Sequence, residues 1–177
     1  MPALRNFGIV LTLCAACIAQ AAGPESKVLK VGATSIAMPW DPAWQVQAPA
    51  SGAPPNKAQF QLANPHDMLV LVNAEAKPSP DADADAYMKL VIDKAIAEYQ
   101  GLAVEQKLEP RSFSKGGTRG HVVCATDRAP KPEEYKYVCQ GIATDDKVAV
   151  IFTVLYNDPG KAQAEKATKA LEASQIQ

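Results

Sequence analysis

The sequence predicts an α+β domain in which a mainly antiparallel sheet carries helices on both sides. Apolar residues alternate along strands in the second half of the chain in a way that makes both faces of the sheet apolar. Two segments, 81–100 and the residues from 158 onward, have the periodicity of helices. Because two apolar faces must both be covered, the helices are expected on opposite sides of the sheet.

Length and composition indicate one globular domain. The chain has 177 residues, of which 47% are hydrophobic and 21% charged, so it has the material for a core and is not disordered. The 18 Lys and Arg residues nearly balance the 19 Asp and Glu residues. Such a balance gives no extended positive field, so neither nucleic acid nor an anionic membrane surface is expected as a partner.

The N-terminus has the features of a secretory signal. Arg5 precedes an apolar run over 7–19, and Ala-Gln-Ala at 19–21 has the small-x-small form of a cleavage site. We therefore expect residues 1–21 to be removed, with cleavage before Ala22. A transmembrane span is the less favoured interpretation, because a span needs about 20 apolar residues; a short buried helix is another.

The mature chain, 22–177, is expected to be exported to the periplasm as a single domain. Cys14-Ala-Ala-Cys17 resembles a lipoprotein processing site, which would anchor the protein at Cys17. Cys14, however, stands where such sites carry a large aliphatic residue, so soluble export is the favoured interpretation. No transmembrane span is expected in the mature chain.

Cys124 and Cys139 are the cysteines that remain after cleavage, in an oxidising compartment. If they lie opposite one another on neighbouring strands, their Cβ atoms are within bridging range, and we predict a structural disulfide. A redox pair would more typically show Cys-x-x-Cys. A zinc site needs about four ligands, and only His66 and His121 could join the cysteines.

Seven strands are expected in the sheet and its surroundings. Met68–Val72 is almost continuously aliphatic, which predicts a strand buried on both faces. A two-residue turn at 145–146 would place Ala143 opposite Val148. The expected strands lie near 33–38, 58–63, 68–72, 102–112, 118–127, 134–143 and 147–157.

The two predicted helices differ in the strength of their apolar faces. The first has one apolar face over 81–100, made of Ala84, Met88, Val91, Ile92, Ala95 and Tyr99. The second begins at Asp158-Pro159, with the acid as N-cap and the proline at the first helical position. Its apolar face is thin, so it is expected to pack lightly.

Residues that could carry catalysis, a cofactor or a metal do not form a recognisable set. The acids at 81, 83 and 85 resemble the start of a calcium loop, but Ala86 and Ile92 stand where an EF-hand needs Gly and Glu. Residues 114–120 have lysine before the glycines, unlike a phosphate loop, and are expected to be a hairpin loop. The histidines are expected in a strand (His121) and a turn (His66). We therefore expect no enzyme, cofactor or metal site.

Trp40 and Trp44 lie in a proline-rich segment, 39–57. One interpretation is that they cover one face of the sheet. The other is that they are contact anchors on an exposed segment, since tryptophan is enriched in binding hot spots. They are the candidate interface residues.

The order of elements resembles the PsbP/DcrB-like (Mog-type) superfamily. A short strand, Ile36-Ala37-Met38-Pro39, is followed by Trp44, then by two strands, a long helix, a meander and a final helix. The resemblance implies an α/β/α sandwich and members that are mostly non-enzymatic assembly factors, adaptors and envelope lipoproteins. It supplies no catalytic residues, and the Cys124–Cys139 pair is not part of its general pattern.

The expected function is therefore protein binding in the periplasm, as an inhibitor or immunity protein or as an assembly factor of an envelope complex. The alternative is a small-molecule or lipid binder with a pocket between helix 81–100 and the sheet. An enzyme is the third and least favoured class.

Overall fold

A computed structural model describes residues 25–48, 54–76, 83–115, 117–145 and 147–177. The predicted signal peptide, its cleavage site and Cys17 lie outside the described residues, and so does Asp81. Within the described residues, no helix is both long enough and apolar enough to cross a membrane.

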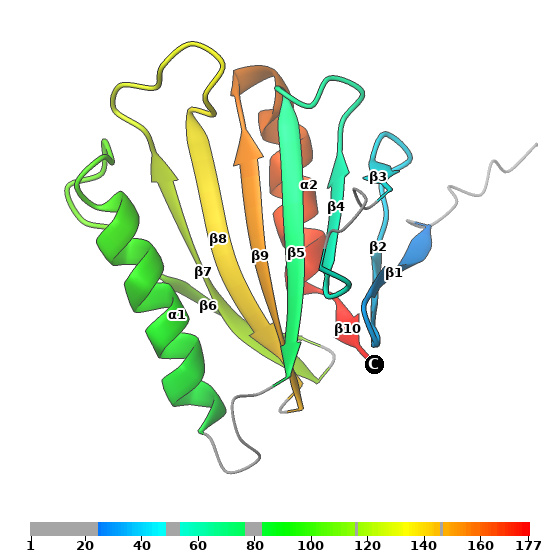
Figure 1. Ribbon diagram of the computed structural model, residues 1–177. Helices are drawn as coiled ribbons and strands as arrows, with labels where there is room; N and C mark the ends of the chain where they lie inside the picture. The colour runs from blue at the N-terminus through cyan, green and yellow to red at the C-terminus, as the bar shows by residue number, and fades with distance from the viewer. Residues whose placement is uncertain (1–24, 49–53, 77–82, 116, 146) are drawn as a thin grey trace, which may run out of the picture.

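The described chain forms two antiparallel sheets and two α-helices (Figure 1). The large sheet has the strand order β3-β4-β5-β9-β8-β7-β6, and the small sheet has the order β1-β2-β10. The elements are β1 (Ser26–Val31), β2 (Thr34–Pro39), β3 (Gln45–Gln47), β4 (Lys57–Gln61), β5 (Met68–Ala76), α1 (Ala84–Tyr99), β6 (Arg111–Lys115), β7 (Thr118–Thr126), β8 (Tyr137–Thr144), β9 (Val148–Tyr156), a 3-10 turn (Asp158–Gly160), α2 (Lys161–Glu172) and β10 (Gln175–Ile176). A mixed fold with antiparallel sheets is thus confirmed.

The helices lie on opposite faces of the large sheet, but they do not cover it equally (Figure 1). α1 contacts β7 and β8, where Met88 and Ile92 pack against Val123 and Ile142. α2 packs on the other face and shares a core with the small sheet. The prediction of a sheet covered by helices on both faces is therefore too simple. One face of the large sheet is covered jointly by α2 and the small sheet, and α1 covers only part of the other face.

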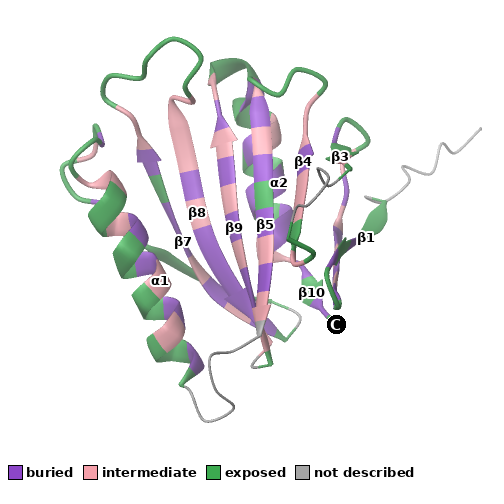
Figure 2. Cartoon of the chain, viewed as in Figure 1, coloured by how far each residue is buried: buried purple, intermediate pink, exposed green. Residues whose placement is uncertain are grey.

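The expectation that residues 68–72 are buried on both faces is wrong, because these residues lie where α1 leaves its face of the sheet uncovered. Met68, Val70 and Val72 are buried on the α2 side, whereas Leu71 on the opposite side is 39% exposed. Figure 2 shows this exposed stretch in the middle of β5. The cause is that α1 lies mainly over β7 and β8 and reaches β5 near the end of that strand, where the Tyr87 hydroxyl donates to Glu75.

α2 packs more closely than its thin apolar face predicted. Ala164, Ala167 and Leu171 are each at most 1% exposed, because small side chains let the helix backbone approach the sheet. Its start also differs: Asn157 is the N-cap of the preceding 3-10 turn. The Asp158 carboxylate instead accepts hydrogen bonds from the Tyr137 hydroxyl and the Lys136 ammonium.

The strand registers are partly as predicted. Cys124 pairs with Cys139, as expected. In the next hairpin Ala143 pairs with Val150 and not with Val148. The loop is two residues longer than predicted because the Asp145 carboxylate accepts the backbone N–H groups of residues 147 and 148. A shift of two residues leaves every side chain on its predicted face.

The strand predicted near 102–112 is wrong: β6 begins at Arg111. The Gln100 side chain donates to the carbonyls of residues 105 and 106 and accepts the N–H of Leu108, so it satisfies the loop backbone in place of a strand neighbour. The hairpin expected at 114–120 is the β6–β7 hairpin, and its strands extend further into this range than expected, because Lys115 pairs with Thr118.

Candidate binding grooves

The segment between β2 and β3 folds both tryptophans into the core. Trp40 is 7% exposed and Trp44 is 4% exposed. Their ring centroids are 5.3 Å apart, and each lies within 5.3 Å of the Phe60 ring centroid on β4. The packing supports the first interpretation, coverage of the sheet, and the expectation of an exposed segment is wrong for the two indoles.

Polar contacts fasten this segment to α2. The Asp41 carboxylate accepts the N–H of Ala43 at 2.9 Å and the ammonium of Lys166 at 2.9 Å. The hydrogen bond from Ala43, and to a smaller extent the one from Lys166, lowers the pKa of Asp41 below its ordinary value. The indole N–H of Trp44 donates to Gln163 Oε1 at 3.1 Å. The loop is thus held in one conformation by charge-assisted and neutral hydrogen bonds to one helix.

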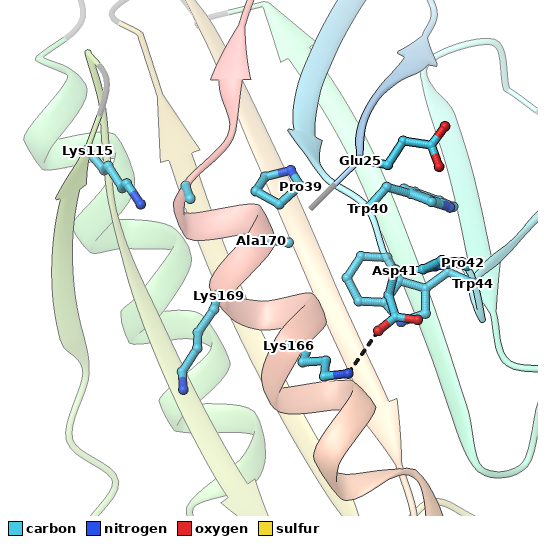
Figure 3. Close-up of a pocket in the computed structure, with 11 residues that line it drawn as sticks. Glu25, Pro39, Trp40, Asp41, Pro42, Trp44, Lys115, Lys166, Lys169 and Ala170 are labelled. Carbon is cyan, nitrogen blue, oxygen red and sulfur yellow. Dashed lines mark hydrogen bonds and ion pairs between the residues drawn. The ribbon is translucent and has the colours of Figure 1, made fainter. Parts of the chain in front are cut away.

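A cavity of about 640 Å³ opens beside the tryptophans; we call it the indole groove (Figure 3). Its apolar lining consists of Pro39, Trp40, Pro42, Trp44, Ala170 and Ala173, and its charged lining consists of Glu25, Asp41, Lys115, Lys166 and Lys169. Figure 3 shows Lys166 reaching from α2 to Asp41. Among the described residues, Lys115 and Lys169 form no ion pair, so their charges face solvent at the groove.

A second cavity, of about 800 Å³, lies against β1 and the β3–β4–β5 part of the large sheet. We call it the strand groove. Residues of β9 complete its lining, and no residue of α1 lines either groove. Side chains such as Met88 and Ala95 are buried between α1 and the sheet, where the alternative function, a small-molecule or lipid binder, would place its pocket.

Cys124 and Cys139 lie directly opposite one another on β7 and β8, with their sulfur atoms 2.07 Å apart, a disulfide distance. Cys139 is buried in the α2-side core, and Cys124 is exposed. The pair lies between two strands and away from the residues that line either groove. This position fits a role in stability.

The two histidines lie in the settings that the sequence predicts. His121 Nδ1 is 3.0 Å from the Ser112 hydroxyl, its cross-strand neighbour on β6. His66 lies in a turn, where its backbone N–H donates to Asn64 Oδ1. Within the part of the chain that the structure describes, no three His, Cys, Asp or Glu side chains are grouped so as to hold a metal.

Sequence reasoning missed the lysines that surround the grooves. Lys115 comes from the β6–β7 hairpin, and Lys166 and Lys169 come from α2. Spacing within α2 could have placed the last two on one side of the helix, at i and i+3. Their meeting with the loop after β2 depends on the tertiary fold, for which the sequence has no local signal.

Comparisons with known proteins support the fold and leave the function to be proposed. No protein-family model and no curated protein matches the sequence. Among solved structures, the chain is similar to cyanobacterial PsbP (CyanoP) from Synechocystis sp. PCC 6803, with a TM-score of 0.53 and 11% identity. The match covers 89% of this chain and 96% of that chain. The resemblance expected from the element order is therefore confirmed at the level of the fold, and the chain has a PsbP-like fold.

Proposed function

We propose that this protein is an exported, non-catalytic accessory module that binds another protein in the periplasm, as an inhibitor or immunity protein or as an assembly factor. The observation that carries the proposal is the indole groove, an apolar surface of indole, proline and alanine beside Lys115 and Lys169, which form no ion pair with the residues that the structure describes. The PsbP-like fold supports it by analogy.

The groove has the properties of a preorganised contact surface. Trp40 and Trp44 are fixed by their ring contacts and by the hydrogen bond to Gln163, so binding would order few side chains. An apolar centre with a charged rim is the usual anatomy of a protein interface. Lys115 and Lys169 would favour a partner segment that carries acidic residues next to apolar ones, because opposite charges steer the encounter.

Export is supported by two independent features. The signal-like N-terminus directs the chain out of the cytoplasm. The cysteine pair at disulfide distance is the arrangement that an oxidising compartment maintains. Mass spectrometry of the exported protein tests the first feature: we expect the protein to begin at Ala22 without lipid, whereas a lipid-modified Cys17 would overturn soluble export.

Truncation of the tryptophans does not test the groove, because buried aromatic side chains support the core and their loss costs about 3–5 kcal/mol. Photo-crosslinking tests the groove without disturbing the core. A photo-reactive amino acid in place of Ala173, in the groove, should give a crosslinked partner in the native periplasm. The same amino acid in place of Leu90, which is 65% exposed on α1, is the matched control.

Reversing the charge of two groove lysines tests whether the crosslinked partner binds through the indole groove. Lys115→Glu together with Lys169→Glu should remove the crosslink from position 173, because both lysines lie on the groove and neither has an acidic partner among the described residues. The proposal fails if position 173 gives no product that position 90 lacks, or if the two reversals leave that product unchanged. Turnover of a substrate by the purified protein would refute the non-catalytic assignment.

A further inference from the structure

The strand groove carries three of the large hydrophobic side chains that the fold leaves exposed. Val28 on β1 is 50% exposed, Val46 on β3 is 41% exposed, and Leu71 on β5 is 39% exposed. Leu71 pairs with Thr153 on β9, which also lines the groove, so both lie on the sheet face that α1 leaves uncovered. Exposed apolar residues that gather in one concave surface mark a ligand site more often than isolated ones do.

The charges in this groove have a single sign. Among the described residues, its lining includes Lys27, Lys30 and Lys57 and no Asp or Glu. Within the described residues, none of the three lysines pairs with a carboxylate. Lys27 lies 4.4 Å from the centroid of the Trp40 ring, and the Lys30 ammonium donates to the Ser35 hydroxyl. The groove is therefore complementary to a molecule that combines an apolar chain with an anionic group.

We propose that the strand groove binds a single-chain anionic amphiphile, such as a fatty acid, with its chain along Val28 and Leu71 and its head group at the lysines. This site is separate from the indole groove and goes beyond the protein-binding function. A volume of about 800 Å³ is in the range of small-molecule sites, roughly 300–1,000 Å³.

The distribution of charge favours a free amphiphile over a membrane surface. The formal net charge of the whole chain is −1, so the protein presents no broad cationic field to a bilayer. The lysines are instead gathered around one concave surface.

Two physical dependences follow. Each CH₂ group that leaves water on binding contributes about fourfold in affinity at most, so affinity should rise from octanoate through decanoate to laurate. The contribution of the lysines is electrostatic and partly exposed to solvent, so affinity for laurate should fall as the salt concentration rises.

The test is calorimetric titration of the full mature chain with laurate, below its micellar concentration. The matched probe is dodecyltrimethylammonium, which has a chain of similar length and the opposite charge. We expect laurate to bind at least tenfold more tightly than the cationic probe. Lys30→Gln with Lys57→Gln should weaken laurate binding about three- to tenfold. Lys94→Gln with Lys147→Gln removes the same charge outside the groove and should leave binding unchanged.

A second pair of variants tests the apolar part of the strand groove at Leu71. Leu71→Asp places a negative charge against the chain and the head group and should weaken laurate binding at least tenfold, whereas Leu90→Asp on α1 should not. If Leu71→Asp fails to fold by circular dichroism, the lysine variants still decide. The proposal is wrong if laurate does not bind, if both probes bind equally, or if control variants lose as much affinity as groove variants. Binding to anionic vesicles without binding to monomeric laurate would also overturn it.

Discussion

Gly141 is the position at which a single methyl group should be most informative. It lies on β8 directly opposite Phe152 on β9. A Cβ atom at Gly141 would lie 2.2 Å from Phe152 Cζ and 2.5 Å from Cε2, well inside van der Waals contact. The ring is 1% exposed and enclosed by the α2-side core, so it has no free space into which to move. Gly141→Ala is therefore an overpacking substitution, and we expect a loss of about 1–3 kcal/mol in unfolding free energy.

That loss corresponds to a fall in Tm of roughly 2–12 °C for a domain of this size, measured by circular dichroism. Gly101→Ala is the control, because among the described residues no heavy atom beyond Gly101 and its two chain neighbours lies within 4 Å of its Cβ position. In a Phe152→Leu background, the cost of Gly141→Ala should shrink, since the obstructing ring is gone. A wild-type Tm for Gly141→Ala, or the same cost in both backgrounds, would refute the argument that this contact sets the packing.

Two further predictions concern the cysteines and a half-buried tyrosine. Cys124→Ala with Cys139→Ala should lower the unfolding free energy by about 3 kcal/mol for the loop of sequence separation 15, measured by denaturant titration; two free thiols in native, non-reduced protein would contradict the bond. Burial and the hydrogen bond to Glu75 raise the pKa of Tyr87 to about 12 from 10.0. The folded state therefore favours the neutral phenol, and this stabilisation is present below pH 10 and lost as the pH rises from 10 to 12. Wild type should lose stability relative to Tyr87→Phe over that interval, and a constant difference in unfolding free energy would refute the assignment.

Strand alternation was the most informative part of the sequence. Once Cys124 was assumed to lie opposite Cys139, it gave the correct pairs between β7 and β8, and it kept the faces of β8 and β9 correct even where the register was wrong by two residues. The reason is that side-chain direction in a strand has a period of two, which is a local property. The length of the loop after β8 depended on hydrogen bonds that the Asp145 carboxylate accepts from the backbone, which the alternation does not report.

Features that depend on distant side chains were not predictable in the same way. The segment before Arg111 has apolar residues suited to a strand, yet the Gln100 side chain pairs with its backbone and keeps it irregular. The tryptophans were identifiable from composition alone, but their burial depends on Phe60 and on α2. The lysines of both grooves come from separate elements, so only the fold brings them together.

The small sheet has a consequence for the order in which the chain folds. β1 and β2 form a local hairpin, but the third strand, β10, comes from the other end of the described chain and pairs Ile176 with Ile36. An isolated two-stranded hairpin is marginal in water, so this one should become stable only once α2 has docked and delivered residues 175–177. Closing so long a loop is slow. Ser35 and Gln177 exchange both of their backbone hydrogen bonds at 2.8 Å, so the completion of this pair should mark the end of folding.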